Sequence, residues 1–234
     1  MTFKLSIRSF IRASVCIVSF LFLAGLIIKG YSVVSSRDRL FGLVHLFDLN
    51  AEQTVTVWYQ TMMLTLIGIL SLIIAKDHRE RKAPFAGHWL GLGLIFILMG
   101  MDEFVSLHEL IGDEILAPVL HTAGHFNSTW LIFAIPLVFL FMFSYLKFFL
   151  ALPAMDRNRM ILALFIYVCG AALIEIPENL YSAHHGEGNL VFVTFVAIEE
   201  FLEMVGMLLL NIALLKKIAG SVKSATIEVV DDRG

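Results

Sequence analysis

The sequence has few charged residues for its length. Of its 234 residues, 16% are Asp, Glu, Lys or Arg and 59% are hydrophobic, and the mean hydropathy is +0.84. Because a soluble globular domain is about a quarter charged, this composition excludes that class. Apolar runs of roughly 18 residues or more, long enough to cross a bilayer, recur along the chain. We therefore predict an all-α polytopic membrane protein, a bundle of helices that contacts the lipid bilayer.

Motifs that would indicate a known chemistry are also missing. The two cysteines, Cys16 and Cys169, both lie in apolar runs, which favours a packing role over a disulfide or a metal role. The sequence contains no CxxC motif, no glycine-rich phosphate loop, no serine nucleophile elbow and no histidine boxes of the desaturase type. A formal net charge of -3 gives no indication of a nucleic-acid partner. Protein partners stay unknown.

The apolar runs predict about six membrane spans, at residues 10–34, 54–75, 88–109, 128–148, 160–181 and 190–215. The first run follows Lys4, Arg8 and Arg12 but is longer than a signal-peptide core, so we expect an uncleaved helix. Residues 1–217 then form a single transmembrane domain, and residues 218–234 form a polar tail.

Basic residues are unevenly distributed between the connections. If the N-terminus is inside, 14 of the 17 Lys and Arg residues are inner, and only Lys29, Arg37 and Arg39 are outer. Positive residues accumulate on the cytoplasmic side of membrane proteins. We therefore predict a multi-pass protein of a bacterial inner membrane with both termini in the cytoplasm.

Acidic residues show the opposite distribution and reach one depth on several spans. A helical rise of about 1.5 Å per residue puts Asp102, Glu175, Glu199 and Glu203 about 18–24 Å from the inner boundary. No Lys or Arg occurs between Lys82 and Lys147 or between Arg159 and Lys216. An ionised acid at a helix centre costs about 2.5–3.5 kcal/mol on insertion scales. These acids must therefore be protonated, hydrated or paired. The predicted layer comprises Asp102, Glu103, Glu175, Glu178, Glu199, Glu200 and Glu203.

Local spacing refines this layer. Asp102, Ser106 and Glu109 have the i, i+4, i+7 spacing of one helical face, although Asp102 is also suited to capping a local break. Pro177, between Glu175 and Glu178, is expected to kink the fifth span. By the depth estimate, Glu178 and Glu109 lie nearest the interface and are the acids most expected to be wet.

Histidines and carboxylates of the outer side predict a divalent metal site. His121 and His125 have the i, i+4 spacing of a helical metal pair, and His108 precedes Glu109. The expected metal is Zn, Fe or Mn. The alternatives are a hydrated vestibule and a proton pathway. The predicted ligands are Asp102, Glu103, His108, Glu109, His121, His125, Glu175, Glu199 and Glu203, with Asp48, Glu52, Glu178 and Glu200 as secondary candidates.

Three segments resemble signatures of an uncharacterised family of bacterial multi-pass membrane proteins. FDLNAEQTVTVWYQ (Phe47–Gln60), DEFVSLHE and EEFLEMVG resemble the patterns FDLxxExxxxxxW, DExxSxHE and EExxEMxG. The family has no assigned activity, so the resemblance implies important positions and no function. Those positions are Asp48, Glu52, Trp58, Asp102, Glu103, His108, Glu109, Glu199, Glu200 and Glu203.

Taken as a whole, the sequence predicts an integral membrane protein that binds a divalent metal in the outer half of its bundle. In its most specific form, this is a metal-dependent membrane enzyme, redox or hydrolytic. A cation- or proton-coupled transporter and a structural or assembly subunit without metal are the alternatives. The inner halves of the spans carry almost no polar residues, which favours a site open to one side over a transporter.

Overall fold

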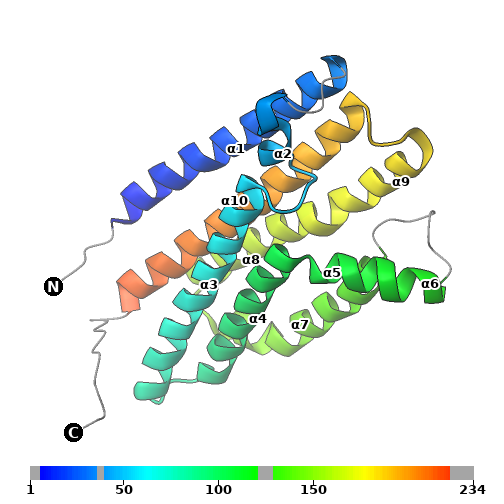
Figure 1. Ribbon diagram of the computed structural model, residues 1–234. Coiled ribbons are helices and arrows are strands. Elements are labelled where there is room, and N and C mark those ends of the chain that lie inside the picture. The colour runs from blue at the N-terminus through cyan, green and yellow to red at the C-terminus, as the bar shows by residue number, and fades with distance from the viewer. Residues whose placement is uncertain (1–5, 36–39, 121–128, 222–234) are drawn as a thin grey trace, which may run out of the picture.

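The computed structural model describes residues 6–35, 40–120 and 129–221, and every regular element in these ranges is a helix. Five helical stretches are long and apolar enough to span a membrane. They are α1 (Ile7–Ser35), α3 (Val55–Glu80), α4 (Ala86–Val105), α7 (Leu131–Ala151) and the stretch Ala154–His185. The predicted all-α membrane fold is confirmed at this level (Figure 1).

The predicted sixth span coincides with α10 (Leu190–Ser221), which is not one of these five stretches. It has 32 residues, but Glu199, Glu200 and Glu203 interrupt its apolar sequence. α10 packs against α1, α3 and α8, and lies between them in Figure 1. Its acids therefore sit inside the bundle, and the count of six spans stays a prediction.

The third predicted span is shorter than expected. α4 ends at Val105, because Ser106 adopts the left-handed conformation (φ 50°, ψ 43°) and breaks the helix. Beyond the break lie α5 (Leu107–Leu110), the π-helical segment Ile111–Leu116 and α6 (Ala117–Leu120). The prediction of one continuous helix to residue 109, with Asp102, Ser106 and Glu109 on one face, was wrong.

A second π-helical segment, Cys169–Ile174, joins α8 (Ala154–Val168) to α9 (Glu175–His185). Pro177 lies in α9, and a proline ring crowds the carbonyl four residues earlier in a regular helix. That earlier residue, Leu173, belongs to the π-helical segment, where the wider turn relieves the crowding. The irregularity expected from Pro177 is therefore found just before it.

Basic side chains gather where α3 turns into α4, where α8 begins and where α10 ends. There Lys217 pairs with Asp156 at 3.4 Å and lies 5.4 Å from the centre of the Trp89 ring. Figure 1 shows that α1 also starts at this end, which we call the basic end. The polar tail predicted at 218–234 lies outside the described residues from residue 222 onward.

The middle of the bundle is closely packed and apolar. Leu64, Ile67, Leu92 and Leu214 are each 0% exposed. α7 joins this core through Tyr145 and Phe148 and otherwise exposes most of its side chains, as expected of a lipid-facing helix. The polar candidates lie beyond this core at the other end, which we call the acidic end. It comprises the start of α3, the α4–α5 junction, α9 and the start of α10.

Candidate functional site

The α4–α5 break is held by Asp102. One oxygen of its carboxylate accepts a hydrogen bond from the backbone N–H of His108 (2.9 Å), and the other lies 2.8 Å from His108 Nδ1. The Ser106 N–H donates to the Asp102 carbonyl at 2.7 Å. Asp102 thus has the capping role that the sequence left open as an alternative to metal ligation.

His108 lies beyond the membrane-spanning part of α4, next to several carboxylates. Burial disfavours its charged form, but the hydrogen bond to Asp102 and the charges of Asp102, Glu109 and Glu103 outweigh this effect. The pKa of His108 is therefore raised above its ordinary value. A protonated His108 supplies positive charge at an end of the bundle where the sequence has few basic residues.

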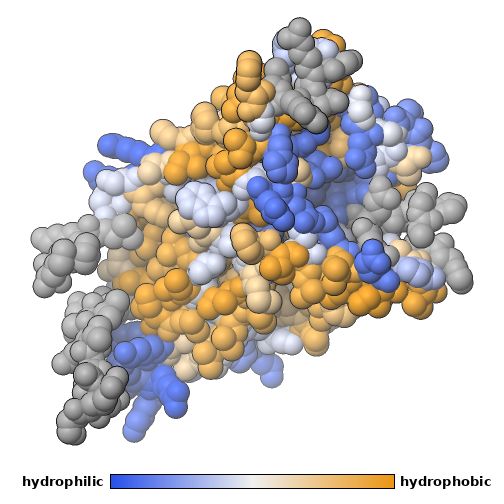
Figure 2. Space-filling model, in the orientation of Figure 1, coloured by the Kyte–Doolittle hydropathy of each residue, from blue (hydrophilic) through white to orange (hydrophobic). Residues whose placement is uncertain are grey.

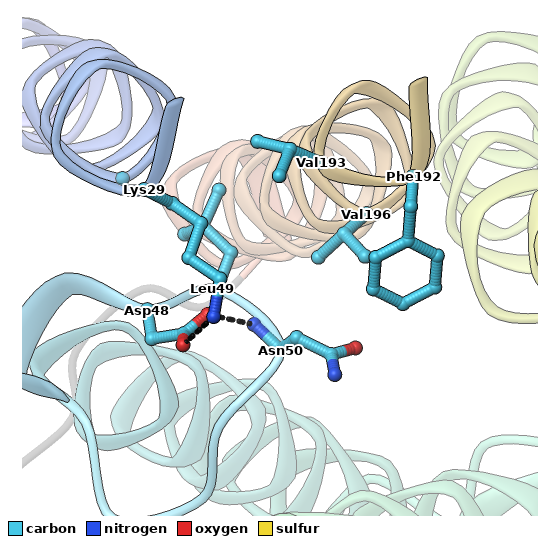
Figure 3. Close-up of a pocket in the computed structure, with 8 residues that line it drawn as sticks. Lys29, Asp48, Leu49, Asn50, Phe192, Val193 and Val196 are labelled. Carbon is cyan, nitrogen blue, oxygen red and sulfur yellow. Dashed lines mark hydrogen bonds and ion pairs between the residues drawn. The ribbon is translucent and has the colours of Figure 1, made fainter. Parts of the chain in front are cut away.

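The loop between α2 (Leu43–Phe47) and α3 crosses α10 in Figure 1 and is anchored on α1. Lys29 forms an ion pair with Asp48, whose other oxygen accepts a hydrogen bond from the Asn50 N–H at 3.2 Å. Leu49 packs so closely on Gly25 that a Cβ there would lie 2.5 Å from Leu49 Cγ. Figure 3 shows these residues around a small pocket that Phe192, Val193 and Val196 of α10 complete.

The same loop carries Glu52 to the α4–α5 break. Hydrogen bonds with Glu109 and Ser106 lower the pKa of Glu52, burial opposes this, and the nearby His108 charge adds to the lowering. The loop therefore bridges α1 and α10 on one side to α5 on the other. Figure 2 shows hydrophilic side chains gathered in a hollow at this end of the molecule.

Three acids from two helices form what we call the carboxylate cluster: Glu103 of α4, and Glu200 and Glu203 of α10. Glu203 is only 9% exposed, and its charge interacts with those of Glu200 and Glu103. Tyr167 of α8 interacts electrostatically with all three carboxylates and with Asp102. Since like charges repel strongly in a poorly hydrated interior, the cluster requires protons or a cation.

Because Gly170 has no side chain, the π-helical segment approaches α10 closely at Glu199 and Glu203. A Cβ on Gly170 would lie 2.7 Å from the Glu199 carbonyl oxygen and 2.8 Å from Glu203 Cγ. The backbone of the segment therefore forms one wall beside Glu203. π-Helical turns of this kind occur often at functional sites.

A second pair of acids, Glu178 of α9 and Glu199 of α10, brings two carboxyl groups within hydrogen-bonding reach of each other. Glu178 is 6% exposed, and its Oε2 is buried without a hydrogen bond from an N–H or hydroxyl donor. The expectation that Glu178 is wet was therefore wrong, because α9 turns it toward α10. Glu109 is exposed.

Three side chains that the sequence analysis did not single out, those of Gln60, Trp130 and Tyr167, interact with the acids. Gln60 Nε2 donates a hydrogen bond to Glu200 Oε2 (2.7 Å), and Trp130 Nε1 donates to Glu175 Oε1 (2.8 Å). Tyr167 interacts with the carboxylate cluster through its electrostatics. Uncharged polar residues in apolar runs are a weak signal of function. For Gln60, the one available signal was its i, i+4 spacing from Thr56, next to the FDLxxE segment.

The charges of Glu103, Glu200 and Glu203 interact with one another, and the neighbouring Glu178–Glu199 pair also interacts with Glu200. Asp48 pairs with Lys29. His121 and His125 lie outside the described residues, as do Arg37 and Arg39. Within the described ranges, no three His, Cys, Asp or Glu side chains are grouped as ready-made metal ligands. The assignment of these residues to a metal site remains a prediction.

Comparison with known families identifies the family of this chain. A family model described as a domain of unknown function, DUF8692, covers residues 13–218. The chain belongs to this family. No curated protein and no solved structure matches the chain. Membership of DUF8692 agrees with the expected uncharacterised family, whereas the three signatures and the bacterial origin stay predictions.

Proposed function

We propose that this DUF8692 protein binds a divalent cation in its carboxylate cluster and uses it as a metal-dependent membrane enzyme. The observation that carries the proposal is that the carboxylates of Glu103, Glu200 and Glu203 interact electrostatically inside the bundle, where Glu203 is 9% exposed. The sequence offers no Lys or Arg to neutralise them between residues 82 and 147 or between 159 and 216. Lys29, on the first helix, is already paired with Asp48.

A bound cation would reduce the repulsion within the cluster and act as a Lewis acid or activate a water molecule. Tyr167 and His108 are the groups beside the cluster that can hold or move a proton. Tyr167 interacts electrostatically with all three carboxylates, and His108 connects through Asp102 to the α4–α5 break. Such a site serves hydrolytic or redox chemistry equally well.

The cluster is separated from the basic end by apolar residues, which favours an enzyme over a transporter. Below the cluster, Leu64, Ile67 and Leu214 are 0% exposed and leave an apolar plug toward the basic end. One observation favours transport, namely Asn211, a fully buried amide in that plug whose Oδ1 has no hydrogen-bond partner. Its Nδ2 donates to the Met63 and Met207 carbonyls at 3.1 and 3.0 Å, which is sufficient for a structural role.

We further propose six spans, with α10 as the sixth, in a bacterial inner membrane and with both termini in the cytoplasm. The support is the 14-to-3 distribution of basic residues in the sequence. In this orientation, the carboxylate cluster opens to the extracytoplasmic side.

The test is elemental analysis of the full chain, purified in detergent without chelator, followed by thermal unfolding with and without added cation. The informative variant is Glu203→Gln, and its matched control is Glu80→Gln at the basic end, where the side chain is 66% exposed. Without cation, Glu203→Gln should be at least as stable as the wild type, because one repelling charge is removed.

With cation, the order should reverse, because the wild type gains binding free energy that Glu203→Gln loses. Glu80→Gln should follow the wild type in both conditions. If the wild type contains no metal and no divalent cation stabilises it, the proposal is wrong, and a structural or proton-coupled role takes its place.

A further inference from the structure

Gln60 of α3 has an unused oxygen next to the carboxylate cluster. The residue is 0% exposed, and its Nε2 is committed to Glu200 Oε2 at 2.7 Å. Its other amide atom, Oε1, is buried and has no hydrogen-bond partner. A buried carbonyl oxygen in a native protein almost always has a partner, such as a donor group, an ordered water or an ion. The bond to Glu200 fixes the amide, so the free oxygen lies beside that carboxylate.

Thr56 provides a second unused oxygen one helical turn away. It is 1% exposed, and its Oγ1 also has no hydrogen-bond partner. Residues four apart lie on the same face of a helix, so Thr56 and Gln60 share one face of α3. Other helical hydroxyls in the protein, such as those of Ser71 and Thr194, donate to the carbonyl four residues earlier at 2.8 Å.

Thr56 does not make this bond: it is the second residue of α3, and the residue four positions earlier, Glu52, lies before the helix. The first turn is instead capped by Thr54, whose Oγ1 accepts from the Val57 N–H at 3.2 Å. The hydroxyl of Thr56 is therefore buried without a hydrogen-bond partner, on the face of α3 that also carries Gln60.

We propose that Gln60 and Thr56 form the uncharged part of the cation site and that, with Glu200, they select a hard divalent cation such as Mg²⁺, Ca²⁺ or Mn²⁺. This inference rests on the proposed cation-binding function and adds ligands and cation class to it. Carboxylate, amide and hydroxyl oxygens are the ligands of hard cations, whereas Zn²⁺ favours imidazole and thiolate. Neutral oxygens also allow coordination to be completed without further like charges.

The experiment measures cation affinity on the full chain in detergent, by calorimetric titration with Mg²⁺, Ca²⁺, Mn²⁺ and Zn²⁺ chlorides. Gln60→Leu and Thr56→Val remove the two oxygens and nearly keep side-chain volume. We expect roughly tenfold or greater weakening of hard-cation binding for Gln60→Leu, and a smaller loss for Thr56→Val. Gln60→Glu keeps an oxygen ligand and should bind the cation far better than Gln60→Leu.

Thr194→Val and Asn211→Leu are the matched controls, because they remove a hydroxyl and a buried amide away from the cluster. Both should keep wild-type affinity. If the wild type binds a cation but Gln60→Leu and Thr56→Val bind it equally well, the two oxygens hold only water, and this inference fails while the proposed function stands. A preference of the wild type for Zn²⁺ over all three hard cations would overturn it as well. Absence of any binding in the wild type would refute the proposed function itself.

Discussion

Gly206 of α10 offers the sharpest test of how α8 and α10 pack around the carboxylate cluster. A Cβ added at Gly206 would lie 2.6 Å from the backbone N, 2.7 Å from Cβ and 2.8 Å from Cα of Tyr167. Nonbonded carbon atoms prefer about 3.5–4.0 Å, so the two helices must separate by about 1 Å to admit a methyl group. Because two of these atoms are backbone, a side-chain rotation cannot relieve the contact.

Gly206→Ala should therefore be destabilising although alanine is the better helix former. Overpacking of this kind costs about 1–3 kcal/mol, whereas Gly to Ala gains at most about 1 kcal/mol in a helix interior. Gly220→Ala, in the same helix with nothing within 4 Å of its added Cβ, is the matched control for the helix-propensity gain.

The assay is thermal unfolding of each variant in detergent, followed by circular dichroism at the helical band. Gly206→Ala should unfold several degrees below Gly220→Ala, since about 1 kcal/mol corresponds to about 2–4 °C for a chain of this size. It should also lose part of the stabilisation by cation, because Tyr167 moves away from Glu203. Equal unfolding temperatures for the two variants would refute the close α8–α10 contact.

Three further predictions concern the acidic end. Because the pKa of His108 is raised in the folded protein, its contribution is fully present below the unfolded value of about 6.5 and is lost as the pH rises through the folded value. The wild type should thus lose stability from about pH 6.5 upward relative to His108→Asn, and parallel pH profiles would contradict this. Lys29→Met should lower stability more than the double variant Lys29→Met with Asp48→Asn, in thermal unfolding, because the single change leaves an unpaired carboxylate; equal losses would show that the pair does not hold the loop. A reporter fused after Gly234 should read cytoplasmic and one inserted at Gly188 extracytoplasmic, and the reverse would place the cluster on the cytoplasmic side.

The sequence was sufficient for the features that depend on local composition and helix geometry. Apolar run lengths located the long helices, but several ends differ from the predicted boundaries: α3 continues to Glu80, α8 begins at Ala154, and α4 stops early at Val105. The common depth calculated from helix rise put Asp102, Glu175, Glu199 and Glu203 at one level, and the charge of Glu203 interacts with that of Glu175. The helix prediction holds because rise per residue and hydropathy change little with tertiary context, whereas a shared acid site stays a prediction.

The misses share a physical cause, which is that each depends on a partner distant in sequence or on a change of helix type. Ser106 reads as an ordinary helical residue, and its left-handed conformation follows from the capping of His108 by Asp102. Glu178 was placed near the interface by counting regular turns, but the π-helical segment before α9 changes which face meets α10. Gln60 shows no charge or periodicity that would separate it from a packing residue.

The polar and apolar layers affect the mechanism because moving a charge into an apolar layer costs free energy. Toward the basic end, Ile67 and Leu214 are fully buried. A cation or proton that moved from Glu203 in that direction would therefore enter an apolar core, without the carboxylates and without water to stabilise its charge. Toward the acidic end, Glu200 leads to Gln60, and the α4–α5 break leads through Asp102 to His108 at its surface. Among the described residues, a cation or proton therefore finds more oxygen and nitrogen partners toward the acidic end than toward the basic end, where Asn211 Oδ1 is buried in the apolar core. That asymmetry is expected of a site that exchanges its ligand with one side of the membrane, and it is the physical reason for preferring a one-sided enzyme over a transporter.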